Sequence, residues 1–137
     1  AKAKQNAIAA IQQKYEIEFK RQMDEFLGQS VVMLRQRVTG IVKSVAAQME
    51  KGDLNNRSLK PLRQVIQSFR DLNFMGDNAV ETALNNLERS MPVRAGELSD
   101  ESVAMQFVKA LDVVEQVAKG NKVARVVERY GRKMMLE

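Results

Sequence analysis

The sequence predicts an all-α fold, a helical bundle of five to six helices with a long N-terminal helix. Strong helix formers such as Ala, Leu, Met, Gln, Glu, Lys and Arg dominate the chain. It contains only 2 Pro and 7 Gly in 137 residues, few for a β protein with many turns. No segment shows a sustained alternation of apolar and polar residues with period two that is bounded by turns. The length is that of one domain, so we expect a single helical domain over 1–137, with the long helix over about 3–51 and the bundle over about 58–136.

The long helix is predicted by apolar residues that recur in steps of three and four. Their order repeats about every eleven residues, which keeps one stripe on a nearly straight helix. The stripe stays in phase across Gly28 and Gly40, which favours one continuous helix; the alternative is two helices folded back at Gly28. Unbroken, the helix measures about 70 Å, longer than a compact domain of this size, so part of it is expected to pack on a partner. The stripe consists of Ile8, Ile11, Tyr15, Phe19, Met23, Phe26, Leu34, Val38, Ile41, Val45 and Met49, with Ser30 in its single gap.

The second helix is expected after a polar loop over 53–57. Gly52 ends the long helix as a C′ glycine. Ser58 is the predicted N-cap, with Pro61 tolerated in the first turn. The helix continues to about residue 73 and turns five apolar residues inward: Leu62, Val65, Ile66, Phe69 and Leu72.

Three further helices follow at short intervals. A turn over 74–76 leads to a helix over 78–90, which Asp77 caps and whose buried residues are Val80, Ala83, Leu84 and Leu87. After a loop over 92–98, Ser99 opens a helix with acidic residues in its first turn. Its predicted buried face is Val103, Phe107, Ala110, Leu111, Val114 and Val117. Gly120 and Asn121 separate it from a final helix over 122–136, which packs through Val123, Val126, Val127, Tyr130 and Met134.

Most catalytic chemistry is excluded by composition. The chain has no Cys and no His, so thiolate nucleophiles, zinc fingers and imidazole bases are absent. No Gly-rich phosphate loop occurs. The carboxylate pairs Asp112/Glu115 and Glu16/Glu18 have spacings typical of solvated helix faces. Residues 71–76 begin like a calcium loop, but Met75 at position 5 and Thr82 at position 12 do not fit its ligand pattern. We therefore expect a chain that is not an enzyme, with no catalytic residue, metal site or cofactor.

Charge is the most informative feature, because it is segregated along the chain. The formal net charge is +5. Residues 1–76 hold 13 basic and 7 acidic side chains, residues 77–118 hold 3 and 8, and residues 119–137 hold 6 and 2. A basic block is thus followed by an acidic block and then by a second basic block. Such an excess permits a polyanionic partner without requiring one.

The final helix carries the clearest row of cations. Their spacings of three and four residues place them on one face, away from the apolar residues of the same helix. The alternative is that they simply complement the dipole at a helix C-terminus. The row consists of Lys122, Arg125, Arg129, Arg132 and Lys133.

Two further basic stretches complete the predicted binding surface. Lys60, Arg63 and Arg70 form a second row, and no acidic residue occurs over 54–70. Arg35 and Arg37 lie in a third stretch, 26–49, that also lacks acidic residues. Arg makes planar bidentate contacts with phosphate. The alternative is that these cations are solvated, or that they pair with the acidic block of the same or a neighbouring molecule.

The sequence thus favours a non-catalytic helical subunit of a larger nucleoprotein assembly. Contacts to the phosphate backbone of DNA or RNA carry affinity without sequence specificity, and the scarcity of aromatics argues against base stacking. The alternative is a structural or scaffold protein that self-associates, or binds a protein partner, through its long helix and segregated charge. No segment approaches the roughly 20 apolar residues of a membrane span and no signal peptide is evident, so we expect no membrane partner and a cytoplasmic location.

Overall fold

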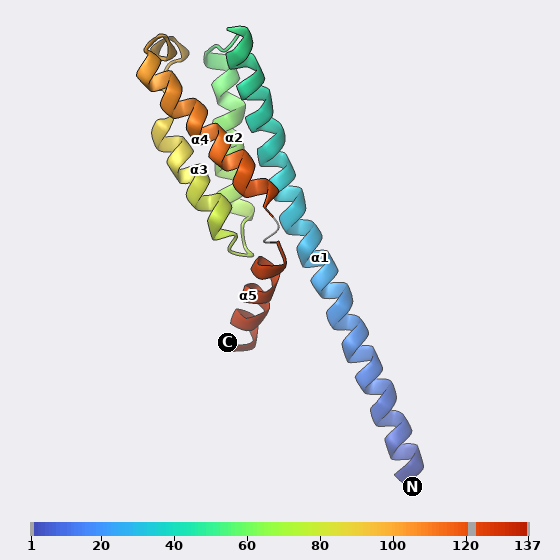
Figure 1. The fold of residues 1–137 in the computed structure, drawn as a ribbon. Helices are drawn as coiled ribbons and strands as arrows, with labels where there is room; N and C mark the ends of the chain where they lie inside the picture. Colours follow the sequence, from blue (N-terminus) through green and yellow to red (C-terminus); the bar gives the residue numbers. More distant parts are fainter. Residues whose placement is uncertain (1, 121–122, 137) are drawn as a thin grey trace.

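The C-terminal half of one long helix lies along one side of a helical bundle, and its N-terminal half projects well beyond the bundle (Figure 1). The structure is a computed structural model that describes residues 2–120 and 123–136. Over these residues it has five α-helices, one short 3-10 helix and no strand, which confirms the predicted all-α bundle with a long N-terminal helix. The elements are α1 (Lys2–Lys51), α2 (Asn56–Leu72), α3 (Asn78–Ser90), η1 (Ala95–Ser99), α4 (Glu101–Lys119) and α5 (Val123–Leu136).

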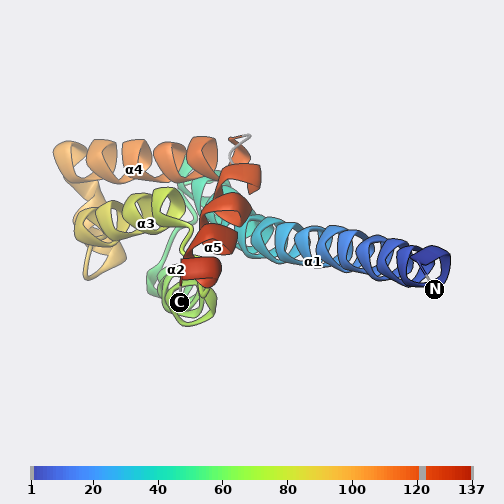
Figure 2. The ribbon, with the colours of Figure 1, turned by 90° about the horizontal axis from the view of Figure 1, so that it is seen from below.

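The long helix α1 is continuous, as its in-phase stripe predicts. It passes through Gly28 and Gly40 without interruption, so the alternative of two helices folded back at Gly28 is wrong. At 1.5 Å per residue it is about 75 Å long. Only its C-terminal half belongs to the bundle (Figure 2).

The N-terminal half of α1 forms an arm, which we define as residues 2–26. Every residue of the arm is exposed, and the first buried residue of α1 is Leu27. From there on, α1 contacts α2, α4 and α5, and these helices together with α3 form what we call the body. The arm is about 37 Å long and leaves the body as a single helix (Figures 1 and 2).

The body is held together by one main hydrophobic core. It gathers buried side chains from α1, α2, α3 and α4, with Phe69, Phe107, Leu59, Leu62, Ile66 and Leu84 among the largest. A second, smaller cluster joins α5 to α1 and to the turn between α2 and α3; its buried members are Leu27, Val31, Met75 and Val126. The Phe74 and Tyr130 rings meet edge to face beside it, with centroids 5.9 Å apart.

The buried face of α1 differs in part from the predicted stripe. Val38 and Val45 are buried as expected, whereas Leu34, Ile41 and Met49 are only partly buried. The buried face is rotated away from the predicted stripe, because α2, α4 and α5 all pack on that side. Its residues repeat every seven positions, with one further buried residue between repeats. The fully buried positions of α1 are Leu27, Val31, Arg35, Val38, Val42 and Val45.

The ends of α1 and α2 follow ordinary capping chemistry, with one correction. Gly52 has φ +71°, and the Asp53 N–H donates to the Gln48 carbonyl at 2.9 Å, which confirms the predicted C′ glycine. The predicted N-cap Ser58 is wrong, because Asn55 takes that position. The two residues instead form a capping box, in which the Ser58 N–H donates to Asn55 Oδ1 and the Asn55 N–H donates to Ser58 Oγ.

The boundaries of α3 and α4 differ little from expectation. Helix α3 buries all four predicted residues. In α4, Asp100 rather than Ser99 is the N-cap, because its Oδ1 accepts the Ser102 and Val103 N–H groups. Ser99 ends η1, which occupies part of the predicted loop. Leu72, expected inside, is 46% exposed at the end of α2.

Two glycines give a matched stability test. Gly76 in the turn before α3 has φ +71°, so Gly76→Ala should destabilise the fold by about 1–2 kcal/mol, since a Cβ disfavours that conformation. Gly40 lies inside α1, where an added Cβ would meet only open space. Gly40→Ala should therefore stabilise by about 0.5–1 kcal/mol. Opposite shifts in Tm by circular dichroism would support this account, and shifts of the same sign would contradict it.

Candidate interaction surfaces

Arg35, predicted to bind phosphate, is a buried structural residue. Its side chain is 3% exposed because it lies on the inward face of α1, between Val31 and Val38. Arg35 Nε and Nη2 donate to the two carboxylate oxygens of Asp77, at 2.7 and 3.0 Å, and Nη1 donates to the Gly120 carbonyl at 3.0 Å. Each of the three guanidinium nitrogens therefore donates within the fold, and the assignment of Arg35 to a nucleic-acid surface is wrong.

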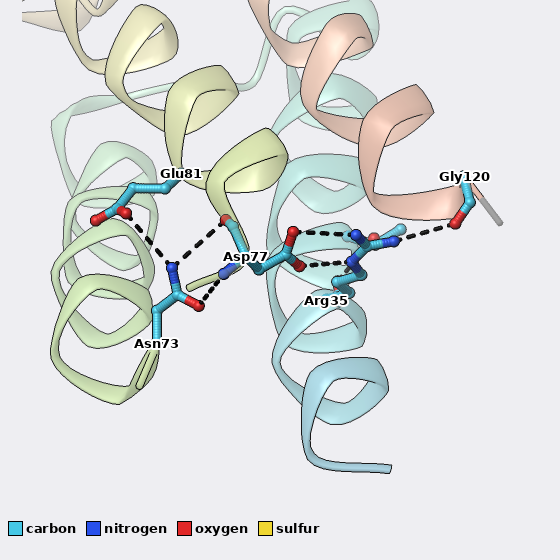
Figure 3. Close-up of polar contacts among 6 residues, drawn as sticks. Arg35, Asn73, Asp77, Glu81 and Gly120 are labelled. Carbon is cyan, nitrogen blue, oxygen red and sulfur yellow. Dashed lines mark hydrogen bonds and ion pairs between the residues drawn. The ribbon is translucent and has the colours of Figure 1, made fainter. Parts of the chain in front are cut away.

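Asp77, predicted only as the cap of α3, is the ion-pair partner of Arg35. It occupies the N-cap position of α3 but makes no side-chain cap hydrogen bond, because its carboxylate faces Arg35 (Figure 3). Asn73 stabilises the turn instead: its Oδ1 accepts the Asp77 N–H at 2.9 Å, and its Nδ2 donates to the Asp77 carbonyl and to Glu81. The network ties α1, the α2–α3 turn and the end of α4 together.

Arg70 is likewise drawn into the body. Its guanidinium makes a bidentate ion pair with Glu88 of α3, both contacts at 3.0 Å, and donates to Asn85 Oδ1 at 2.7 Å. The pair lowers the pKa of the Glu88 carboxyl and raises the pKa of Arg70, chiefly through these hydrogen bonds. For Arg35 and Arg70, then, the alternative holds: the basic block pairs with the acidic block of the same molecule.

The remaining cations of α1 and α2 are exposed. Arg63 donates through Nη2 to the Pro92 and Val93 carbonyls, both at 3.1 Å, so it also anchors the loop before η1. Lys60 and Arg37 are exposed, on α2 and α1 respectively. The predicted row of Lys60, Arg63 and Arg70 is therefore reduced to one cation without a described intramolecular bond, Lys60.

The row on α5 has the arrangement expected from its spacing. Arg125, Arg129, Arg132 and Lys133 are all exposed, while Val126 is buried against α1. Over the described residues none of these four takes part in an ion pair. Lys122, the fifth member of the predicted row, lies outside the described residues.

The carboxylates singled out in the sequence behave as ordinary surface groups. Glu115 accepts a hydrogen bond from Lys119 at 2.7 Å, and Asp112 accepts one from Gln116 at 2.9 Å. Glu18 pairs with Arg21. The pKa of Glu115 and the pKa of Glu18 are lowered, mainly by these hydrogen bonds.

The arm carries the most distinctive exposed surface. Its apolar stripe, which we call the arm stripe, is 41–72% exposed, although these side chains are as large as those of the core. The arm stripe consists of Ile8, Ile11, Tyr15, Phe19, Met23 and Phe26. Ile17, also exposed, lies on the opposite face at about 100° per residue. A contiguous apolar surface of this kind is typical of an interaction site.

A groove of about 850 Å³ lies at the base of the arm, between α1 and α5. The sequence predicts the apolar residues of both walls but not that the walls lie together, since only the crossing of α5 over α1 brings them into one groove. Phe19 and Met23 belong to both the arm stripe and the groove. The other apolar lining residues are Leu27, Val127, Tyr130 and Met134.

Membrane-spanning helices and metal clusters do not occur in the described residues. Within 2–120 and 123–136, no helix is long and apolar enough to cross a membrane. The same part of the chain holds no group of three or more acidic side chains placed to bind a metal ion. Comparison of the chain with models of known protein families, with curated proteins and with solved structures gives no match.

Proposed function

We propose that this chain is a non-catalytic helical subunit of a larger assembly, and that the arm joins it to a protein partner. The observation that supports this most strongly is the arm stripe, six large apolar side chains exposed along one face of a helix that has left the body. Burying such side chains drives most protein association. Every residue of the arm is exposed, so the arm gains little stability from tertiary packing, on which helices usually depend, and a partner would also stabilise its helix.

Site-specific photo-crosslinking tests this proposal. A photoreactive amino acid at Tyr15, on the arm stripe, should cross-link the chain to protein under native conditions. The same amino acid at Ile17, on the opposite face, should cross-link far less. Equal cross-linking from both faces, or none from Tyr15, would contradict a role for the arm stripe.

A second candidate function is contact with nucleic-acid backbone through α5, as the sequence suggests. Four exposed cations on one face, Arg125, Arg129, Arg132 and Lys133, favour it. Arg35 and Arg70 pair with carboxylates of the body, so the cationic surface is narrower than the sequence predicts. A nucleoprotein subunit of this kind would work in the cytoplasm. Backbone contacts of this kind are independent of base sequence.

Charge neutralisation on α5 should reveal this second function. The triple variant Arg125→Gln, Arg129→Gln, Arg132→Gln is expected to weaken binding to duplex DNA and RNA alike. It should also lower the slope of log Kd against log salt by about 2–3, since each phosphate contact contributes about 0.9. Fluorescence anisotropy across a salt series measures both quantities.

The matched control also removes three positive charges, but from the acidic block over 77–118. Arg89→Gln, Arg94→Gln, Lys109→Gln changes three exposed cations elsewhere in the body. If both triple variants weaken binding equally, net charge rather than α5 is responsible. Absence of binding by the unmodified chain at low salt would eliminate this candidate and leave the protein-binding arm unaffected.

A further inference from the structure

We infer that the partner of the arm is the arm of a second copy of this chain, packed antiparallel to it. This inference rests on the proposed function and names its partner. The arm stripe is symmetric about position 17: Ile8 and Phe26 lie nine residues either side, Ile11 and Met23 six, and Tyr15 and Phe19 two. Reversing the direction of the arm therefore reproduces the same spacing of large apolar side chains.

The symmetry defines a register for two antiparallel arms. With the two copies centred on position 17, Ile8 faces Phe26 of the second copy, Ile11 faces Met23, and Tyr15 faces Phe19. Every layer then pairs two large apolar side chains, and each pair occurs twice because of the twofold axis. Beyond Phe26 the stripe reaches Ser30, its one polar position, where the arm enters the body.

Charges beside the arm stripe agree with this register. At about 100° per residue, Lys14 and Glu18 lie on one flank of the stripe, and Glu16 and Lys20 lie on the other. Antiparallel pairing brings like flanks together, so Lys14 comes beside Glu18 of the second copy and Glu16 comes beside Lys20. All four side chains are exposed in the single chain.

The direction of pairing also follows from the end of the arm. Lys2, Lys4 and Lys14 are the only charged residues over 2–15. Parallel pairing would set these lysines against themselves and bring the two bodies together at the same end. Antiparallel pairing separates the bodies and sets each lysine-bearing tip against residues 27–32 of the other chain, which carry no charged side chain.

The surface available is large enough for a stable dimer. Each arm contributes three aromatic side chains, each able to bury roughly 150–250 Å², together with Ile8, Ile11 and Met23. This approaches the area of about 800 Å² per partner that specific interfaces bury. The groove extends the surface, because it adds the apolar walls Leu27, Val127 and Tyr130 to Phe19 and Met23 of the arm stripe.

Sedimentation equilibrium and introduced cysteines test the inference. The full chain of 15.5 kDa should sediment as a dimer of twice that mass. Ile11→Lys should weaken the dimer at least about 100-fold, since each dimer loses two buried Ile side chains. Ile17→Lys, the same change on the opposite face, should leave the dimer within about threefold of the original Kd, and circular dichroism should show equal helix content for both.

Direction is read from disulfides, because the chain has no native Cys. An equimolar mixture of Ile8→Cys and Phe26→Cys chains should form the mixed disulfide. Preferential Ile8→Cys homodimers would indicate parallel arms and overturn the inference. A monomer at all concentrations would also overturn it; if Tyr15 then cross-links to a different protein, the proposed function stands, and if it cross-links to nothing, both fail.

Discussion

Arg35→Ala is expected to destabilise the fold by about 3–5 kcal/mol, because it leaves the Asp77 carboxylate buried without its charge partner. Asp77 is 2% exposed, so water cannot replace the guanidinium. The Gly120 carbonyl loses its donor as well. Urea denaturation followed by circular dichroism gives the free energy of unfolding.

Two further variants separate charge burial from other effects of the substitution. Arg37→Ala changes an exposed arginine two residues away and should shift the free energy of unfolding by no more than about 0.5 kcal/mol. Arg35→Met combined with Asp77→Leu removes both charges, so it should cost less than Arg35→Ala alone. A double variant as unstable as Arg35→Ala would show that the uncompensated charge is not the cause.

Phe107→Ala should cost about 3–5 kcal/mol, the other large effect we expect. Phe107 is fully buried where α4 packs in the main core, with 0% of its surface exposed. Alanine removes the ring and leaves a cavity that α1 and α3, which also pack on α4, can fill only in part.

Met105→Ala on the same helix is the matched control for Phe107→Ala. Met105 is 55% exposed, so its truncation should change the free energy of unfolding by less than about 0.5 kcal/mol. The comparison holds helix propensity nearly constant and isolates burial. Similar losses from the two substitutions would mean that α4 does not pack as described.

Local patterns in the sequence predicted most of the fold, because they depend on neighbours along the chain. The four buried residues of α3 follow from helical spacing alone, and Gly52 follows from the αL conformation that ends a helix. The cap of α2 was misplaced because Asn55 and Ser58 are both good N-cap residues three positions apart. Because α2 begins one turn earlier than predicted, Asn55 rather than Ser58 is the N-cap.

Tertiary contacts, in contrast, determine which of the predicted cations are buried and paired and which are exposed. Arg35 and Arg37 belong to the same basic stretch, and nothing in charge or spacing to other cations separates them. The signal that distinguishes Arg35 is its position on the Val31, Val38 and Val42 row, which places it on the inward face. Its pairing with Asp77, across 42 positions of sequence, required the turn between α2 and α3 to meet α1.

Because α1 is continuous through Gly28, the length of the arm and the direction in which the arm stripe faces always change together. Each inserted or deleted residue moves the tip by 1.5 Å and also turns it by about 100°. One residue removed between Phe26 and Leu27 would thus shorten the arm slightly but swing the arm stripe to another side of the body. Removing eleven residues shortens it by about 16 Å and restores nearly the same orientation. The length of the arm can therefore change without turning the arm stripe only when the number of residues added or removed is close to a whole number of helical turns.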